Sequence, residues 1–348
     1  MKPPRWLVKA SPHVASPEST PRIMWSVVAT LVPIVLASFY FFGPSALLVI
    51  GAATLGAVLV EAWFGKKRSL FDGSAVITGV LLGLTLPPGM PMWMAFVGGG
   101  FGIAFGKLVF GGLGQNPFNP ALIGRAFLQA AFPVAITTWP QNAVGNPVFS
   151  HFGFDRLASW AALRGDNFAL PLMSPHVLDG TTSATPLGLM KFQHVSSDLS
   201  TLLLGSTGGS LGETSALLIL LGGLYLALRN HLNWRIPVSI LATVFVFSGL
   251  LHVAAPDQFA APWFMLFSGG LMLGAWYMAT DMVTSPVTNK GCLVFGVGIG
   301  ALVVIIRTWG GLPEGVQYSI LLMNALVPFI NRATQPRVFG TQKARASS

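Results

Sequence analysis

The sequence predicts an all-α polytopic membrane protein with about ten transmembrane helices. The first observation is its composition, because 53% of the 348 residues are hydrophobic and only 9% are charged. A soluble domain carries about 25% charged residues, so this chain has too few charges to cover a water-facing surface. The second observation is that apolar runs near the ~20 residues needed to cross a bilayer recur along the chain. Together they exclude a soluble enzyme, a nucleic-acid-binding protein and a disordered protein.

The apolar runs form two groups of five, separated by a long polar interval. The first group lies at 23–41, 44–64, 74–87, 92–110 and 120–137. The second group lies at 215–228, 236–253, 263–280, 292–308 and 316–330. The run at 74–87 is short and ends at Pro87-Pro88. It therefore predicts a broken or re-entrant helix, because proline removes a backbone hydrogen-bond donor.

These runs divide the chain into two five-helix halves with a loop between them and a polar tail at each end. An odd number of crossings in each half places the halves in opposite orientations, as in inverted repeats. Similarity of residues between the halves is too weak to show a repeat, so the inversion is an expectation of architecture alone. The expected parts are a tail at 1–22, a first half at 23–137, an external loop at 138–213, a second half at 214–331 and a tail at 332–348.

Basic residues predict the orientation, because loops on the cytoplasmic side are enriched in lysine and arginine. With the N-terminus inside, the external loop holds only Arg156, Arg164 and Lys191. We therefore expect both termini in the cytoplasm and the long loop outside. The cytoplasmic segments then hold fifteen of the twenty basic residues, namely Lys2, Arg5, Lys9, Arg22, Lys66, Lys67, Arg68, Lys107, Arg229, Arg235, Lys290, Arg332, Arg337, Lys343 and Arg345.

Cysteine and histidine usage limits the chemistry that the chain performs alone. The single cysteine, Cys292, excludes a cysteine-ligated iron–sulfur cluster within this chain. No pair of histidine or acidic residues has the spacing of a zinc site. We expect no metal site and no complete active site here, so electron transfer would require an organic cofactor or a partner's cluster.

Polar residues cluster at 179–185 in the external loop. On local chemistry this run is a turn, because Asp-Gly favours turns and Ser/Thr hydroxyls bond to nearby backbone. The run also resembles the motif Asp-x-x-(Ser/Thr)-(Gly/Ser)-Ala-(Thr/Ser), which bacterial flavin transferases recognise. This resemblance implies that Thr185 carries FMN through a phosphoester bond, while Ser183 stands where glycine is common. The matching residues are Asp179, Thr182, Ser183, Ala184 and Thr185.

Three further motifs open or close the apolar runs. The stretch 111–121 is rich in glycine and proline, and its Asn116 and Asn119 are candidate caps of the following helix, which carries Arg125. The stretch 278–286 contains Asp281 at the expected membrane boundary, where a carboxylate needs a partner or water. The third motif is Asp72-Gly73-Ser74-Ala75, before the short third run.

All four motifs resemble the NqrB/RnfD family of membrane flavoproteins, and the likeness covers nearly the whole chain. It includes Ser11-Pro12-His13 in the tail and the Leu86-Pro87-Pro88 break. The short N-terminal tail and the total length favour the RnfD branch over the longer NqrB. The resemblance implies a subunit of the Rnf complex, which couples electron transfer between ferredoxin and NAD to ion movement across the bacterial inner membrane.

The resemblance also implies cofactors and partners. The cofactors are FMN on Thr185 in the periplasmic loop and a non-covalent riboflavin, for which Asn116, Asn119 and Arg125 are the candidate pocket residues. Maturation requires a flavin transferase, and the lipid bilayer surrounds the chain, with no role for nucleic acid. The implied protein partners are RnfA, RnfB, RnfC, RnfE and RnfG.

Two alternatives remain open at this point. An NqrB-like subunit of a sodium-pumping NADH:quinone reductase shares the same motifs, and a secondary transporter shares the composition and topology. The run 179–185 separates the flavoprotein from the transporter, which needs no flavin acceptor. Ionisable residues near the membrane are candidates for ion movement, although topology, pairing or snorkelling to the interface is the favoured interpretation. They are Glu61, Asp72, Lys107, Arg125, Asp281 and Arg307.

Overall fold

All regular structure in the described part of the chain is helical, and no strand occurs there. The computed structural model describes residues 18–65, 70–139, 165–171, 185–193, 197–205, 208–213, 215–256 and 258–336.

The first half begins with two long helices that meet at one residue. Helices α1 (Thr20–Phe42) and α2 (Pro44–Phe64) are separated by Gly43, whose φ of 76° ends one helix and allows Pro44 to start the next. The remaining elements are α3 (Ser74–Leu84), α4 (Met92–Ile103), the π-helix η2 (Ala104–Leu108), α5 (Pro120–Ala131) and α6 (Pro133–Thr137).

The second half follows four short elements, which are the 3₁₀-helices η4 (Gly165–Phe168) and η5 (Leu211–Glu213) and the helices α8 (Pro186–Gln193) and α9 (Leu199–Leu204). Its own elements are α10 (Ala216–Leu228), α11 (Arg235–Ala254), α12 (Pro262–Phe267), α13 (Leu271–Leu273), the π-helix η6 (Gly274–Met278), α14 (Asn289–Trp309) and α15 (Val316–Thr334).

Each apolar run expected from the sequence is helical, but the runs differ in length and continuity. Four helices are long and apolar enough to cross a membrane, namely α1, α2, α11 and α14. The expected run at 120–137 is divided at Phe132, because Pro133 starts a new helix. The run at 263–280 is divided at Ser268–Gly270, where Gly269 has a φ of 66°. A continuous crossing is therefore the wrong description for both runs.

Small residues allow the helices of each half to approach closely. A side chain at Gly56 of α2 would collide with the Phe96 carbonyl of α4, and one at Gly99 of α4 would collide with the Ala53 carbonyl of α2. In the second half Gly300 of α14 lies against the Ile240 carbonyl of α11. Close packing of this kind drives helix association in lipid, where apolar surface gives no advantage to helix pairs.

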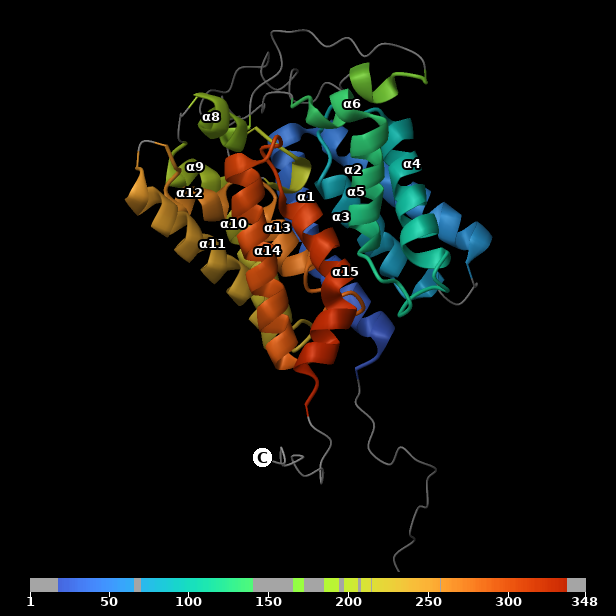
Figure 1. The fold of residues 1–348 in the computed structure, drawn as a ribbon. Coiled ribbons are helices and arrows are strands. Elements are labelled where there is room, and N and C mark those ends of the chain that lie inside the picture. Colours follow the sequence, from blue (N-terminus) through green and yellow to red (C-terminus); the bar gives the residue numbers. More distant parts are fainter. Residues whose placement is uncertain are drawn as a thin grey trace, which may run out of the picture.

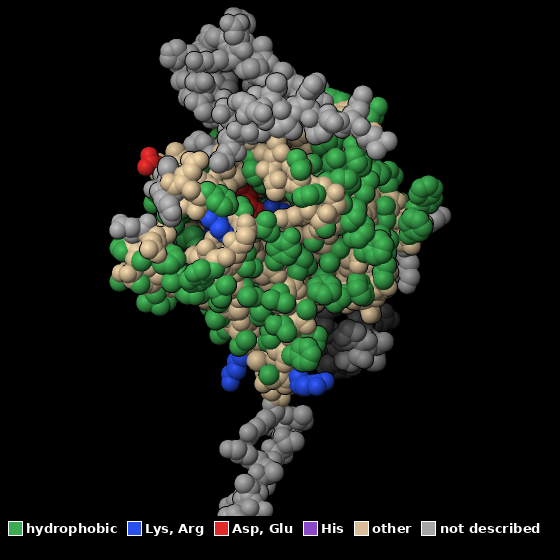
Figure 2. Space-filling view, turned by 45° about the horizontal axis from the view of Figure 1, so that its top comes forward, with side chains coloured by type: hydrophobic (Ala, Val, Ile, Leu, Met, Phe, Trp, Pro, Cys, Tyr) green, Lys and Arg blue, Asp and Glu red, His purple; other side chains and the backbone are tan. Residues whose placement is uncertain are grey.

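The molecule has two ends, which the following text calls the tail end and the loop end. Helix α1 begins and α15 ends at the tail end, whereas α6, α8 and α9 lie at the opposite loop end (Figure 1). Between them the surface is largely apolar, and charged side chains gather at the tail end and in a hollow near the loop end (Figure 2). A broad apolar band with polar ends is the surface expected for a chain in a bilayer.

Candidate functional site

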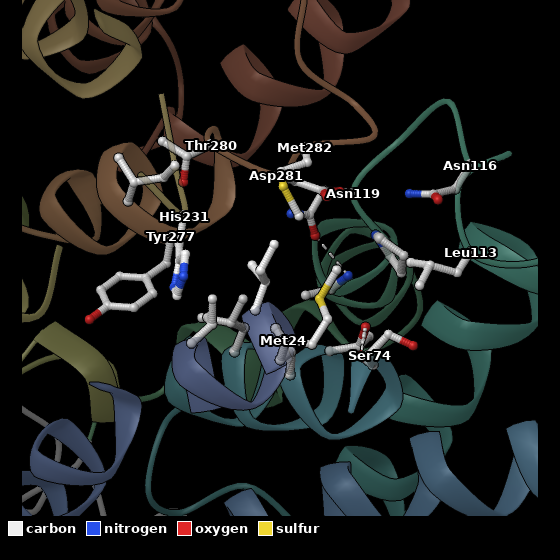
Figure 3. Close-up of a pocket in the computed structure, with 18 of the residues that line it drawn as sticks. Met24, Ser74, Leu113, Asn116, Asn119, His231, Tyr277, Thr280, Asp281 and Met282 are labelled. Atoms are coloured by element: carbon white, nitrogen blue, oxygen red, sulfur yellow. Dashed lines mark hydrogen bonds between the residues drawn. The ribbon is translucent and has the colours of Figure 1, made fainter. Parts of the chain in front are cut away.

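Three of the four sequence motifs, those that contain Ser74, Asn116 and Asp281, meet at a cavity at the tail end. Its walls come from α1, α3, α5 and both π-helices, and Lys107 of η2 faces it together with Trp276 and Tyr277 of η6. Figure 3 shows Thr280, Asp281 and Asn116 among the side chains around this cavity. Single-turn π-helices occur often at functional sites, so two of them at one cavity mark it as a candidate binding site.

Asn119 has a structural role at this cavity, and the capping interpretation is confirmed. Its Oδ1 accepts hydrogen bonds from the backbone N–H groups of Ala121 (3.0 Å) and Leu122 (3.3 Å) at the start of α5. Its Nδ2 donates to the carbonyl of Met278 at the end of η6, at 3.0 Å. One buried side chain thus caps α5 and joins the two halves of the molecule.

The substitution Asn119→Ala is expected to destabilise the fold by about 2–4 kcal/mol, because it removes an N-cap and leaves the Met278 carbonyl unsatisfied. Asn119→Ser is the matched control, since serine keeps a side-chain oxygen for the cap and loses the Nδ2 donor without adding a charge. We expect the serine variant to lose less stability in a detergent-unfolding titration. Equal stability of Asn119→Ala and the unmodified chain would refute the structural role.

Asn116 and Asp281 provide polar groups that the protein does not fully use. Asn116 Nδ2 donates to the Phe118 carbonyl at 3.3 Å, while its buried Oδ1 has no hydrogen-bond partner among the described residues. The Asp281 carboxylate accepts from the Val283 N–H and the Thr284 hydroxyl, both at 3.3 Å. Burial raises the pKa of Asp281 above its ordinary value, although the bonds to these groups and to Asn116 oppose the shift.

A buried ion pair lies beside the same cavity. Lys107 Nζ donates to Glu61 Oε1 and to Ser74 Oγ, both at 2.5 Å, and the side chains of Lys107 and Glu61 are 2% and 0% exposed. Ser74 Oγ in turn donates to Asp72 Oδ1. Of the two interpretations left open by the sequence, pairing is therefore correct for Lys107 and Glu61, and neither side chain snorkels to the interface.

Thr185 lines a second cavity, which is at the loop end and has a volume of about 260 Å³. Its side chain is 5% exposed, and its Oγ1 accepts a hydrogen bond from the Gly188 N–H at 3.1 Å at the start of α8. Trp139 and Phe192 supply aromatic surface to this cavity. The run that resembles the flavinylation motif is described only in part, because residues Asp179, Thr182, Ser183 and Ala184 lie outside the described residues.

Arg125 belongs to the loop-end cavity and not with Asn116 and Asn119. Its guanidinium donates to Glu314 Oε2 at 2.7 Å, and both groups line the cavity of Thr185. The three residues expected to form one pocket therefore contribute to two separate cavities, because Asn119 begins α5 and Arg125 lies further along that helix toward the loop end.

Sequence reasoning missed Glu314, which lines this cavity, and Lys191, which lines a neighbouring one. Lys191 of α8 donates to the carbonyls of Gly310 (2.5 Å) and Leu312 (3.0 Å), which holds α8 against the turn after α14. Burial lowers the pKa of Lys191. Only eleven of the 348 residues are acidic. An acidic residue between two transmembrane runs is therefore uncommon in this chain, and this could have marked Glu314 as a candidate site residue. Across the described ranges, no cluster of three His, Cys, Asp or Glu could hold a metal.

The comparisons with known proteins agree with one another, and the matches cover almost the whole chain. Residues 7–340 match the family model described as "NQR2, RnfD, RnfE family". The chain is 42% identical to the D subunit of the proton-translocating ferredoxin:NAD(+) oxidoreductase complex of Clostridium ljungdahlii, over 97% of this chain and 96% of that protein.

Two further relatives match the same share of this chain. One is the D subunit of the Na(+)-translocating ferredoxin:NAD(+) oxidoreductase complex of Acetobacterium woodii, at 40% identity over 97% of this chain and 96% of that protein. The other is the D subunit of the ion-translocating oxidoreductase complex of Aliivibrio salmonicida, at 40% identity over 97% of this chain and 99% of that protein. The chain therefore belongs to the NQR2, RnfD, RnfE family.

Proposed function

We propose that this chain is the RnfD-type component of an ion-translocating ferredoxin:NAD+ oxidoreductase complex and that it carries electrons through FMN attached to Thr185. The observation that carries the proposal is the near-complete alignment, at about 40% identity, with relatives that are named as this component. The chain acts as one part of a translocase, and its oxidoreductase activity requires the other subunits.

The residues around Thr185 fit a phosphoester-linked flavin. The hydroxyl lies at the N-terminus of α8, where backbone N–H groups and the helix dipole favour a phosphate. Gln317 Nε2 is buried without a partner among the described residues, and the aromatic rings of Trp139 and Phe192 suit a flat ring system. Bound FMN supplies one- and two-electron transfer, while Thr185 anchors it and Arg125 provides positive charge beside it.

The tail-end cavity fits the polar edge of a non-covalent riboflavin. Asn116 Oδ1 and Trp276 Nε1 are buried without hydrogen-bond partners in the described structure, so an acceptor and a donor remain for a ligand. The cavity measures about 90 Å³, which is smaller than a three-ring flavin. Met24 and Met282 line it, and unbranched methionine side chains adapt readily to a new neighbour, so we infer that these two side chains move when riboflavin binds.

We infer ten membrane crossings in two inverted five-helix halves, at 23–137 and 214–331. The tail end then faces the cytoplasm with the tails at 1–22 and 332–348, and the loop at 138–213 faces the periplasm. The proximity of the first and last helix ends supports this topology (Figure 1). In this arrangement the two flavins lie near opposite sides of the inner membrane, so the chain carries electrons across it between RnfA, RnfB, RnfC, RnfE and RnfG.

The test is electron transfer in inverted membrane vesicles from cells with and without the chain. We expect deletion to abolish NAD+ reduction by reduced ferredoxin and the ion uptake that accompanies it, and plasmid-borne expression to restore both. Loss of NADH:quinone reductase activity instead would favour the NqrB-like alternative. No loss of either activity would favour the transporter. Uptake of labelled sodium, with and without a protonophore, identifies the ion, which differs between the names of the Clostridium and Acetobacterium relatives.

A further inference from the structure

Four charged side chains from distant parts of the chain meet at the loop end. Arg125 of α5 pairs with Glu314, which lies in the turn between α14 and α15. Arg307 of α14 is 4% exposed and approaches the same glutamate, and Glu213 of η5 lies next to it. Two arginines and two glutamates thus form a compact group, which the following text calls the loop-end charge cluster.

The cluster is built into the break between α12 and α13. Arg307 donates to the carbonyls of Met265 (2.6 Å) and Ser268 (2.9 Å), which the broken helix leaves free. A Cβ atom at Gly269 would lie 3.6 Å from Glu314 Oε1, and one at Gly270 would lie 3.5 Å from Glu213 Oε1. Adjacent glycines therefore keep room for both carboxyl groups at the same place.

The two carboxyl groups contact each other without a donor between them. Their side chains lie within hydrogen-bonding reach of one another. The Oε1 atom of each is buried, yet neither accepts a hydrogen bond from any described residue. Two neighbouring carboxylates cannot both ionise without repulsion, and one proton between them would satisfy both orphan oxygens. Glu314 has the arginine partner, so Glu213 is the residue that remains protonated.

We propose that Glu213 and Glu314 hold a single proton between them and deliver it to the loop-end cavity when a flavin bound at Thr185 is reduced. The second part rests on the proposed function, whereas the shared proton does not. Glu314 lines the cavity of Thr185, and Glu213 lies behind it. Reduced ferredoxin supplies the electron through the complex. The O–H bond on Glu213 would break, the proton would pass by way of Glu314 to a ring nitrogen of the reduced flavin, and it would return to the pair on reoxidation.

The charges around the pair allow both protonation states. With one proton on the pair, two arginines face one carboxylate, and the cluster has a net charge of +1 from Arg125, Arg307 and Glu314. After the proton leaves, two carboxylates face two arginines and the charges balance. Burial and the neighbouring Glu314 raise the pKa of Glu213 well above its usual range. The positive charge of Arg125 holds the pKa of Glu314 below the ordinary value of a glutamate. The ammonium group of Lys191 on α8 binds backbone carbonyls.

The first experiment is infrared spectroscopy of the purified complex carrying Thr185→Val, which removes the flavin. We expect a protonated-carboxyl band at neutral pH that shifts in heavy water, disappears only at a pH well above the ordinary titration of glutamate, and is absent when Glu213→Gln is added. Asp198→Asn, on an exposed residue, and Asp281→Asn should both leave this band in place. Absence of the band from the Thr185→Val complex, or its survival in the Glu213→Gln variant, would overturn the shared proton.

The second experiment is the reduced-minus-oxidised infrared spectrum of the flavin-loaded complex. We expect the loss of one protonated carboxyl per chain on reduction, no such loss in Glu213→Gln, and a normal loss in Asp198→Asn. A band that reduction leaves unchanged would overturn the delivery of the proton. If Thr185 carries no flavin while the band of the first experiment persists, the proposed function fails and the shared proton stands.

Discussion

The substitution Thr185→Val is expected to abolish covalent flavin completely. Valine keeps the shape of threonine but has no hydroxyl, and the phosphoester bond requires that oxygen. The measurement is in-gel fluorescence of the denatured chain after co-expression with a flavin transferase. The structure adds a cost that the sequence did not suggest, because the Thr185 hydroxyl is buried and caps α8. Losing such a cap costs about 1 kcal/mol, so the yield in the membrane should fall only slightly.

Two control variants separate attachment from folding. Thr185→Ser keeps both the hydroxyl and the cap, and serine also satisfies the last position of the motif, so flavin should remain. Thr181→Val lies outside the matching positions and should also retain it. A fluorescent band in Thr185→Val would show that another residue is the acceptor. If the unmodified chain gave no band while the transferase modified another target, the attachment of FMN to Thr185 would be refuted, whereas membership of the family would stand.

The positions of the helices were largely predictable because hydrophobicity alone determines which segments can enter a bilayer. The start of α5 was predictable for a local reason, since Asn119 before Pro120 is a typical N-cap sequence. The division of the run at 263–280 was not, although Gly269-Gly270 lies within it. A helix breaks there only because Arg307, from a different helix, satisfies the free carbonyls, and no local pattern records that distant partner.

The candidate sites were predictable to the extent that their residues lie in one motif. Asn116 and Asp281 were singled out individually, but their meeting at one cavity depends on the packing of the two halves. Arg125 was assigned to the wrong neighbours because its partner, Glu314, is 189 positions away in the sequence. Glu213 escaped notice for the same reason, since a lone glutamate at a loop boundary becomes informative only beside a second carboxyl group.

The substitution Lys107→Met is expected to destabilise the fold strongly, by about 3–5 kcal/mol, because it leaves Glu61 charged, buried and unpaired. Glu61 is fully buried, and its Oε2 already lacks a partner in the described structure, so Lys107 provides its only neutralising contact there. The measurement is the midpoint of unfolding in a detergent titration of the purified complex. Lys290→Met is the matched control, because Lys290 is exposed at the start of α14 and its loss should change stability by less than about 0.5 kcal/mol.

The double variant Glu61→Leu with Lys107→Met distinguishes a lost contact from an uncompensated charge. A buried ion pair replaced by apolar side chains of similar volume is often neutral or stabilising, so we expect the double variant to regain most of the stability that Lys107→Met loses. If the double variant were as unstable as the single one, the packing of the lysine stem would be responsible, and the charge would not. If it regains stability but loses riboflavin, the pair is retained because Lys107 and Ser74 present their polar groups to the tail-end cavity.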